Sequence, residues 1–353
     1  MPAESRLIAV ATAVPPYPLD QADVKERVKM LFGRRSDDVE RLLPVFTNTG
    51  IATRYSCVPI DWYNEPHTWP ERNRIYLESA LDLLETATLR VLDKAGMAPG
   101  DIDAIVVVST TGVATPSLDA LLMERMQLKR TIRRLPIFGL GCAGGVIGMA
   151  RAAAQATVAP GENVLFLVVE LCALSFRRDD LSKSNIVATA LFGDGAAAAI
   201  LSTNGTGPVI AASGEHTWPG SLGIMGWEVT EDGMKAIFSR DIPRLVTEQM
   251  RDVATAFLER NGLTLSQINQ FVCHPGGAKV LDALEYAFGI GQGALVEARR
   301  VLQDYGNMSA ATVMFVLERI LAAAPASGHS WARAMMSTLG PGFTTGFLVL
   351  ENR

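Results

Sequence analysis

Residues 139–150 read GLGCAGGVIGMA and join a cysteine to an apolar helix. The eight residues from Ala143 to Ala150 carry no charge, so the expected helix has no face suited to water and is packed on all sides. Each glycine within a helix costs about 1 kcal/mol relative to alanine, and the three glycines here indicate a backbone that lies close to its neighbours. We therefore predict a central, buried helix that begins directly after Cys142.

The segments around this run follow a strand–loop–helix pattern that occurs twice along the chain. Cys142 follows Thr110, at the end of the first buried strand, by 32 residues, and Asn307 follows His274, at the end of the second, by 33. A repeat of about half the chain indicates a duplicated fold. The paired elements are the strands 105–110 and 271–274, the helices 118–127 and 278–288, the helices 143–156 and 308–321, and the strands 163–169 and 332–337.

The repeat divides the chain into two α/β halves. Each half ends in a glycine-rich turn followed by an apolar strand. The cluster of turn-forming residues at 202–208 marks the boundary between the two halves. The N-terminal half is therefore expected at residues 1–205 and the C-terminal half at residues 206–353. A pseudo-twofold arrangement of these halves would bring Cys142 and Asn307 towards one central cavity.

Composition and charge place the chain among large globular proteins. With 353 residues, 48% of them hydrophobic, it can bury a large core, and a mean hydropathy of +0.20 favours sheets covered on both faces. No apolar run approaches the roughly 18 residues of a membrane helix, and residues 7–14 predict a first β-strand rather than a signal peptide. The net charge of −5, without a basic cluster, argues against a nucleic-acid partner.

Cysteine usage points to a reducing compartment. The four cysteines are widely spaced and form no Cys-x-x-Cys pair, a pattern too sparse for a disulfide scaffold or a zinc site. We therefore expect a cytoplasmic protein without a metal site.

Cys142 is the candidate nucleophile. A helix N-terminus offers free N–H donors and partial positive charge, which together favour a thiolate. The glycines on either side would let a substrate reach the sulfur. The alternative is a buried, inert cysteine, which is the usual state of a free cysteine.

His274 and Asn307 are the candidate partners of this cysteine. His274 ends a buried strand, and Pro275 with two glycines then turns the chain so that the imidazole projects from the strand end. Its alternative role is that of a satisfied core histidine. Asn307 begins the matching helix of the second half, where an asparagine is normally an N-cap. In the functional interpretation its amide donates to a carbonyl oxygen.

These three side chains suit a decarboxylating condensation of thioesters. The cysteine takes an acyl group covalently, and the histidine keeps the sulfur a thiolate between cycles. A malonyl thioester then loses carbon dioxide, and donors from His274 and Asn307 hold the enolate as an oxyanion hole does. The chemistry needs no cofactor beyond coenzyme A (CoA) thioesters as substrates. A Cys-His-Asn protease is the other interpretation, which the duplicated βα frame fits poorly.

Five ordered motifs resemble the type III polyketide synthases, the chalcone- and stilbene-synthase-like family, over essentially the whole chain. The resemblance implies an αβαβα thiolase-like fold and a homodimer with one complete site in each subunit. It also implies that Cys142, His274 and Asn307 form the catalytic triad and that acyl-CoA and malonyl-CoA are the substrates. The motifs are Gly141–Gly145, Ala190–Ala196, His274–Gly277, Gly306–Ser309 and Gly340–Gly342.

The resemblance assigns further roles residue by residue. Phe192 falls on a gatekeeper phenylalanine between the CoA tunnel and the cavity, although alone it would be interpreted as a core aromatic before a tight turn. Arg41 and Arg54 fall on positions that contact CoA, and no residue is assigned to the second gatekeeper aromatic. The remaining substrate-binding residues are Thr110, Cys172, Ser175, Ser309, Gly340, Pro341 and Gly342.

Two features of the sequence bear on the products. Thr115 stands where plant relatives carry a longer methionine that reaches into the partner subunit's cavity. Residues 177–183 and 278–284 resemble those of bacterial enzymes that make alkylpyrones and alkylresorcinols from long fatty acyl starters. We therefore predict pyrone or resorcinol products from long-chain acyl-CoA.

Two other functions stay open at this stage. A ketoacyl-carrier-protein synthase III shares the implied fold and triad but performs a single condensation with a carrier protein. Its histidine motif resembles His-Gln-Ala-Asn, unlike His274–Gly277 here. A thiolase-fold protein that binds acyl-CoA without turnover is the second alternative, and it would leave Cys142 without an acyl adduct.

Overall fold

The structure, a computed structural model, describes residues 3–33, 38–327 and 331–353. In this part of the chain the strands are β1 (Arg6–Ala13), β2 (Tyr17–Asp20), β3 (Thr53–Ser56), β4 (Ala104–Val108), β5 (Arg133–Ile137), β6 (Asn163–Leu171), β7 (Asp194–Ser202), β8 (Val209–Thr217), β9 (Met225–Thr230), β10 (Gly233–Phe238), β11 (Gln270–Cys273), β12 (Arg333–Gly340) and β13 (Thr344–Glu351). The helices are α1 (Gln21–Phe32), α2 (Asp38–Leu42), α3 (Pro44–Asn48), α4 (Trp69–Ala95), α5 (Leu118–Arg125), α6 (Gly144–Val158), α7 (Lys183–Leu191), α8 (Ile242–Arg260), α9 (Ala278–Phe288), α10 (Val296–Tyr305) and α11 (Thr312–Ser327). Short 3₁₀ turns are η1 (Ile60–Asn64), η2 (Pro99–Asp101), η3 (Gly141–Ala143), η4 (Cys172–Ser175), η5 (Leu265–Gln267) and η6 (Ser309–Ala311).

A nine-stranded sheet runs through the molecule in the order β11-β12-β13-β8-β1-β7-β6-β4-β5. The first strands of the two halves, β1 and β8, lie side by side and pair at Arg6 and Val209. On one side β7, β6 and β4 follow β1, and on the other side β13, β12 and β11 follow β8 in the same way. The directions repeat as well, because β7–β6 and β13–β12 are antiparallel while β6–β4 and β12–β11 are parallel. The duplicated α/β fold predicted from the sequence is confirmed, with β5 as an extra edge strand in the first half.

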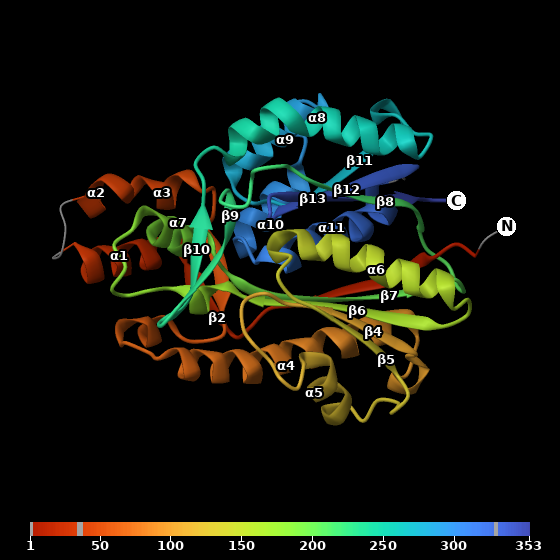
Figure 1. The fold of residues 1–353 in the computed structure, drawn as a ribbon, viewed down its shortest axis with the longest axis horizontal. Coiled ribbons are helices and arrows are strands. Elements are labelled where there is room, and N and C mark those ends of the chain that lie inside the picture. The colour runs from red at the N-terminus through yellow and green to blue at the C-terminus, as the bar shows by residue number, and fades with distance from the viewer. Residues whose placement is uncertain (1–2, 34–37, 328–330) are drawn as a thin grey trace.

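Helices lie outside and between the two halves of this sheet (Figure 1). In the middle, α6 contacts β4 and β6 of its own half and β12 and β13 of the other, and it also contacts α11. On one outer face α4 covers β1, β6 and β7, with α5 beside it. On the opposite side α8 and α9 pack against each other over the second half. The layers therefore follow the αβαβα order of a thiolase-like fold.

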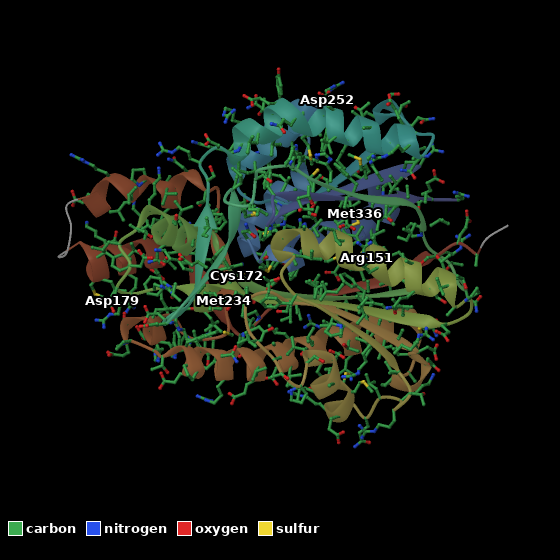
Figure 2. All side chains as sticks on the ribbon, viewed as in Figure 1. Arg151, Cys172, Asp179, Met234, Asp252 and Met336 are labelled. Carbon is green, nitrogen blue, oxygen red and sulfur yellow. The ribbon has the colours of Figure 1, made fainter. Side chains whose placement is uncertain are left out.

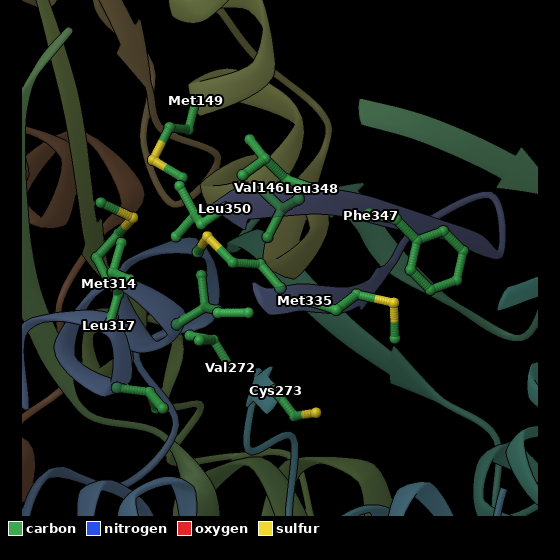
Figure 3. Packing of buried hydrophobic residues seen from close by; sticks show 14 of the residues in the cluster. Val146, Met149, Val272, Cys273, Met314, Leu317, Met335, Phe347, Leu348 and Leu350 are labelled. Atoms are coloured by element: carbon green, nitrogen blue, oxygen red, sulfur yellow. The ribbon is translucent and has the colours of Figure 1, made fainter. Parts of the chain in front are cut away.

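The glycines of α6 let the central layer pack closely. A Cβ atom at Gly145 would lie 2.3 Å from the carbonyl oxygen of Ala310, and one at Gly148 would lie 2.5 Å from Cγ2 of Val108. The predicted central, buried helix is therefore confirmed, and its glycines are explained by close contact on two sides. Figure 3 shows side chains that meet in this layer, among them Val146, Met149, Met314, Leu317, Leu348 and Leu350.

The two central helices begin later than the sequence predicted. Helix α6 begins at Gly144 after the turn η3, and α11 begins at Thr312 after the turn η6. Cys142 therefore lies in the turn before α6, and Asn307 lies two residues before η6, where it forms an isolated β-bridge with Phe192. Ser309 adopts a left-handed φ of +48° in the second turn, a conformation that hydrophobic periodicity does not reveal.

None of the described helices combines the length and the apolar character needed to cross a bilayer. Within the same residues, no group of three or more His, Cys, Asp or Glu side chains is arranged to hold a metal ion. The four cysteines are all buried and free of disulfides.

Candidate active site

Cys142 sits in a turn whose packing requires glycine. The backbone of Gly141 has a φ of +48°, and a Cβ atom there would lie 2.6 Å from Cδ of Pro341. A Cβ atom at Gly340 would lie 2.5 Å from a carbonyl oxygen of the segment that leads into the same turn. The predicted loop Gly340–Gly342 thus packs directly against the turn that carries the candidate nucleophile.

The sulfur of Cys142 is enclosed by protein. The residue is 8% exposed, and its Sγ donates to Oγ of Ser309 at 3.4 Å. Burial raises the pKa of the thiol to about 12, and the bond to Ser309 opposes this shift only in part. Burial in this structure thus works against the resting thiolate that the sequence analysis expected. The reason is that α6 begins only at Gly144, while exclusion of water favours the neutral thiol.

A buried carboxyl group supports this turn from behind. The backbone N–H of Gly141 donates to Oγ1 of Thr110 at 3.2 Å. Oε2 of Glu170 accepts the backbone N–H groups of Thr110 and Thr111 at 3.0 and 3.1 Å and the Thr111 hydroxyl at 2.9 Å. Thr110, predicted to line the substrate cavity, is thus placed as a buried support of the Cys142 turn. Glu170 was missed because a lone carboxylate inside a buried strand carries no motif.

Glu170 should make the stability of the protein depend on pH. Burial raises its pKa from 4.5 to about 7, so the folded state favours the protonated form and this contribution is lost as pH rises through about 7. A shift of this size corresponds to about 3 kcal/mol of unfolding free energy. We expect Glu170→Gln, which stays neutral, to gain up to that amount relative to wild type between about pH 4.5 and about pH 8.

Urea unfolding of both proteins across this pH range measures the difference directly. Asp194 also has a pKa raised by burial, to about 6, but it is present in both proteins and cancels in the comparison. A free-energy difference between Glu170→Gln and wild type that stays constant with pH would contradict the prediction.

His274 lies at the end of β11 with an unpartnered imidazole. Its backbone N–H donates to the carbonyl oxygen of Ser337 at 2.9 Å. The residue is 4% exposed, and neither Nδ1 nor Nε2 has a hydrogen-bond partner among the described residues. Burial lowers the pKa of the ring to about 3, so the imidazole is neutral near pH 7 with one donor and one acceptor nitrogen. The thiolate–imidazolium pair expected between Cys142 and His274 is not formed between these two described side chains.

Asn307 is held in place by hydrogen bonds of its backbone and of its carboxamide. Its N–H donates to the carbonyl oxygen of Leu191 at 2.8 Å, and its carbonyl oxygen accepts the N–H of Gly193 at 3.1 Å. Its Oδ1 accepts the N–H of Ser309 at 2.8 Å, and its Nδ2 donates to the carbonyl oxygen of Gly276 at 3.3 Å. These contacts fix the orientation of the carboxamide. The second hydrogen of Nδ2 remains for another acceptor.

Cys142, His274 and Asn307 line one open cavity of about 440 Å³. The structure therefore brings together the three side chains that the sequence placed in different halves. A neutral imidazole can accept the proton of a thiol, and an imidazole N–H and an amide N–H can both donate to a carbonyl oxygen. The arrangement has the groups needed for acyl transfer from a thioester and for holding an enolate.

A smaller space of about 20 Å³ lies on another side of Cys142, with Phe192 in its wall. The Phe192 ring stacks on Trp227 with ring centroids 5.8 Å apart and meets Phe238 edge-on at 5.6 Å. Ser309 also lines this space. Phe238 of β10 is a second aromatic in the wall of this space, and no motif marked it in the sequence.

An apolar pocket of about 50 Å³ lies beyond Phe192. Cys172 and Ser175 line this pocket, and Oγ of Ser175 donates to the carbonyl oxygen of Cys172 at 2.6 Å. The turn η4, which begins at Cys172, contacts β10 of the hairpin formed by β9 and β10, and Figure 2 labels Cys172 and Met234 in these two elements. Phe192 lines both this pocket and the smaller space beside Cys142, so its ring lies between Cys142 and the two predicted substrate-binding residues.

Arg54 is not where the sequence analysis expected it. The residue is 1% exposed and lines the apolar pocket beyond Phe192, beside the backbone of Gly193 and Gly306. Burial lowers the pKa of its guanidinium to about 10. The prediction that Arg54 contacts CoA is wrong, because a bulky phosphorylated ligand has no access to a fully buried side chain.

Exposed cations line the open cavity. Arg41, the other predicted CoA contact, lies there together with Lys183, Arg240 and Lys279, which the sequence analysis did not identify. Lys183 and Lys279 fall in segments singled out only for their resemblance to alkylpyrone-forming enzymes. Their place at the cavity could not be read from the sequence, because α2, α7, α9 and the segment after β10 meet only in the folded protein.

A buried cysteine, imidazole and carboxamide on one cavity, at the centre of a duplicated αβαβα frame, define a condensing enzyme of the thiolase-like fold. Family models of the chalcone and stilbene synthases match nearly the whole chain, the N-terminal domain at residues 3–206 and the C-terminal domain at residues 210–352. The chain belongs to the chalcone and stilbene synthase family, the type III polyketide synthases, and is a decarboxylating acyltransferase.

Individual relatives agree with this assignment. A putative chalcone synthase of Bacillus subtilis is 36% identical over 98% of this chain and 98% of that protein. The alpha-pyrone synthesis polyketide synthase-like Pks18 of Mycobacterium tuberculosis is 27% identical over 97% of this chain and 91% of that protein. The crystal structure of 1,3,6,8-tetrahydroxynaphthalene synthase from Streptomyces coelicolor matches with a TM-score of 0.92 at 27% identity, covering 98% of this chain and 99% of that one.

Proposed function

We propose that Cys142 takes an acyl group from acyl-CoA, that malonyl-CoA extends it in repeated decarboxylative condensations, and that cyclisation releases pyrones or resorcinols. The observation that carries the proposal is the convergence of Cys142, His274 and Asn307 on one cavity. The relative from Mycobacterium tuberculosis, named for α-pyrone synthesis, supports the product class.

Loading begins from the neutral pair. As Sγ of Cys142 attacks the thioester carbonyl, its proton passes to the acceptor nitrogen of His274. The bond between the carbonyl carbon and the CoA sulfur then breaks, and the departing CoA thiolate takes the proton from the imidazolium. Burial raises the pKa of the thiol and lowers that of the imidazole, so in this proposal the charged imidazolium exists only while the acyl group is being transferred.

Extension uses the same imidazole as a donor. The thioester oxygen of malonyl-CoA accepts N–H groups from His274 and Asn307, and the bond to the carboxylate breaks to release carbon dioxide. The electron pair of that bond forms an enolate, whose carbon attacks the acyl group on Cys142. The cysteine sulfur leaves as a thiolate and regains a proton from solvent, and the chain is longer by two carbons.

The cations of the open cavity suit the phosphates of CoA. Arg41, Lys183, Arg240 and Lys279 line the cavity that also holds the triad. Arginine forks and lysine ammonium groups are the side chains that bind phosphate in proteins. We therefore assign the nucleotide part of CoA to this side, and the proposed chemistry uses CoA thioesters without a further cofactor or a metal.

The acyl chain then occupies the opposite side of Cys142. Phe192 lies between the space beside the sulfur and the apolar pocket that Cys172 and Ser175 line, and Phe238 contacts its ring. An apolar pocket suits an alkyl chain, since burying each CH₂ contributes about 0.8 kcal/mol. This supports an alkyl group on that side of Cys142, with the ring of Phe192 as the gate.

The edge strand β5 supports a homodimer. Its side chains are exposed or half-buried, and Phe138, directly after the strand, is 62% exposed. An open strand edge beside an exposed aromatic is a surface that another chain can cover. We propose that a second copy pairs along β5. The cytoplasmic location expected from the sequence is supported by the four free cysteines.

Product analysis tests the proposed function. The purified enzyme is incubated with malonyl-CoA and with acyl-CoA starters from acetyl to stearoyl, and products are identified by mass spectrometry. We expect triketide and tetraketide pyrones or resorcinols that carry the alkyl chain of the starter, with long starters preferred. The matching pantetheine thioesters serve as the control for CoA recognition, and we expect a higher KM for them because they lack the nucleotide phosphates.

Each alternative has its own outcome. Products with a single extension would favour a ketoacyl synthase III-like reaction, and acyl-CoA binding without carbon dioxide release would favour a protein without turnover. Tetrahydroxynaphthalene carries no alkyl chain, so its formation from malonyl-CoA alone would contradict the preference for long starters.

A further inference from the structure

The hairpin of β9 and β10 forms one wall of the space beside Cys142, yet it belongs to no larger sheet. Within the described chain its two strands pair only with each other. Trp227 of β9 and Phe238 of β10 contact Phe192 at its inner end. A two-stranded hairpin alone is marginally stable in water. The position of this wall must therefore be set by contacts with the rest of the protein.

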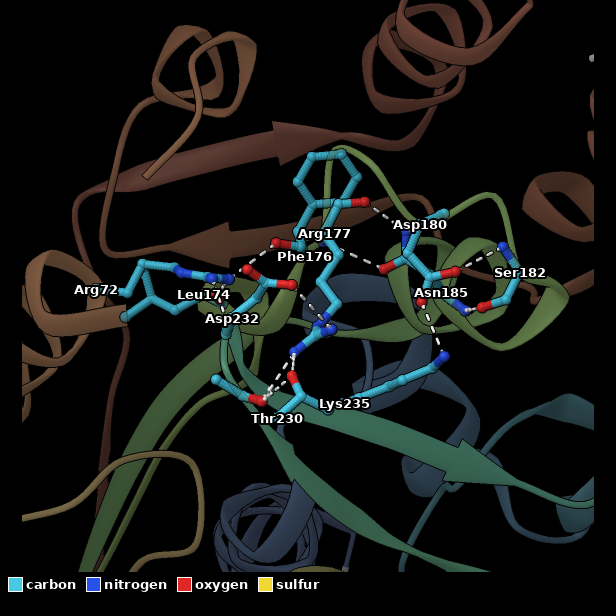
Figure 4. Close-up of polar contacts among 11 residues, drawn as sticks. Arg72, Leu174, Phe176, Arg177, Asp180, Ser182, Asn185, Thr230, Asp232 and Lys235 are labelled. Atoms are coloured by element: carbon cyan, nitrogen blue, oxygen red, sulfur yellow. Dashed lines mark hydrogen bonds and ion pairs between the residues drawn. The ribbon is translucent and has the colours of Figure 1, made fainter. Parts of the chain in front are cut away.

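Arg177 holds the other end of the hairpin. Its Nη2 donates to Oγ1 of Thr230 and to the carbonyl oxygen of Gly233, the latter at 2.8 Å (Figure 4). Its Nη1 lies 3.9 Å from Oδ2 of Asp232 in the turn between the strands. The side chain of Arg177 is only 12% exposed, so competition from water is weak.

A second arginine ties the same turn to α4. Nη2 of Arg72 donates to the carbonyl oxygen of Asp232, and its Nη1 donates to the carbonyl oxygens of Phe176 and Leu174 at 3.2 and 3.4 Å. One side chain therefore joins the hairpin turn to the segment that leads into Arg177 (Figure 4).

Helix α7 connects this clamp to the aromatic contact. Oδ1 of Asn185 accepts the N–H of Arg177 at 3.2 Å, and its Nδ2 donates to the carbonyl oxygens of Arg177 and Asp180, both at 2.7 Å. The same helix ends at Leu191 and presents Phe192 as its C-cap. The hairpin is thus fixed at its turn by a residue anchored to α7 and contacts Phe192 at the other end of α7.

We propose that Arg177, assisted by Arg72, is a positioning residue for acyl-chain selection. It fixes how closely Trp227 and Phe238 approach Phe192, and so sets the size of the acyl space beside Cys142. The inference rests on the proposed function, because that function assigns the space to the acyl chain. Without the clamp the hairpin recedes, and longer starters gain relative to shorter ones.

Arg177→Ala tests the inference by two readouts. We expect the ratio of kcat/KM for a long to a short acyl-CoA starter to rise by about three- to tenfold, within the range that substitutions outside a ligand site produce. Hydrogen exchange of the β9–β10 amides should become faster while that of the central sheet stays unchanged. Arg177→Lys should restore only part of the effect, because one ammonium nitrogen can replace Nη2 at Thr230 and Gly233 but cannot also replace Nη1 near Asp232.

Arg299→Ala is the matched control. Arg299 is also a partly buried arginine, 31% exposed, and it pairs with Asp282 and Glu285 away from the hairpin. It should lower stability without changing the starter ratio. Thr230→Val removes only the hydroxyl that Arg177 contacts, and it should shift the starter ratio in the same direction as Arg177→Ala. If Arg177→Ala does not fold, Thr230→Val replaces it as the test variant.

The outcomes separate the two proposals. An unchanged starter ratio in Arg177→Ala and Thr230→Val, or an equal shift in Arg299→Ala, would overturn the positioning role. Unchanged exchange of the hairpin amides would overturn the clamp itself. If the wild-type enzyme makes no polyketide, the proposed function fails, and the exchange readout still decides whether Arg177 holds the hairpin.

Discussion

We expect Cys142→Ala to lose acyl loading completely and to lower product formation by about 10⁴-fold or more, as removal of a catalytic nucleophile does. The sulfur is the atom that would carry the starter, and no other described cysteine lines the open cavity. Intact-protein mass spectrometry measures loading, and chromatography of the reaction measures product. The substitution removes a single atom from a buried site, so the fold should survive.

Cys57→Ala is the control for this variant. Cys57 is also buried and free, but its backbone N–H bonds to Asp194 and it lies outside the cavity of the triad. It should load acyl groups and form products at nearly the wild-type rate. Retained polyketide output by Cys142→Ala would refute the covalent role of the sulfur.

His274→Ala should lose decarboxylation as well as condensation. The imidazole is one of two donors to the developing enolate, and removal of one such donor typically lowers a rate by about 10²- to 10³-fold. It is also the acceptor for the thiol proton, so loading slows in the same variant. Release of labelled carbon dioxide from malonyl-CoA without a starter isolates the first effect.

Two further variants sharpen the assignment of His274. His274→Gln keeps an N–H donor, so it should recover part of the carbon dioxide release but little of the loading. His216→Ala serves as the control, because His216 packs against Trp218 away from the triad. Carbon dioxide release by His274→Ala at the wild-type rate would contradict the enolate assignment.

The fold could be predicted because its signals are local and repeated. The uncharged segment around Val146, with its three glycines, predicts a fully buried helix. In the structure this helix, α6, packs against strands of both halves. The strands that precede Thr110 and His274 are short and largely apolar, and both lie in the nine-stranded sheet. The motif residues Cys142, His274 and Asn307 needed only the duplication to be placed near one another.

The missed features depend on contacts between distant parts of the chain. Arg54 is buried because Gly193 and Gly306 leave room for its side chain, and neither is near it in sequence. The raised pKa of Cys142 follows from its enclosure by residues of both halves. The hairpin of β9 and β10 does not pair with the larger sheet. Arg177, which holds this hairpin, lies in a segment that the sequence analysis interpreted only by resemblance.

The proposed chemistry depends on one covalent event at one sulfur. Wild-type enzyme incubated with a long-chain acyl-CoA in the absence of malonyl-CoA, then digested and analysed by peptide mass spectrometry, reveals that event directly. The account predicts a single acyl adduct on the peptide that contains Cys142, with release of an equal amount of free CoA. An unmodified Cys142 peptide, with the acyl group on Cys57, Cys172 or Cys273 or on no cysteine, would contradict it.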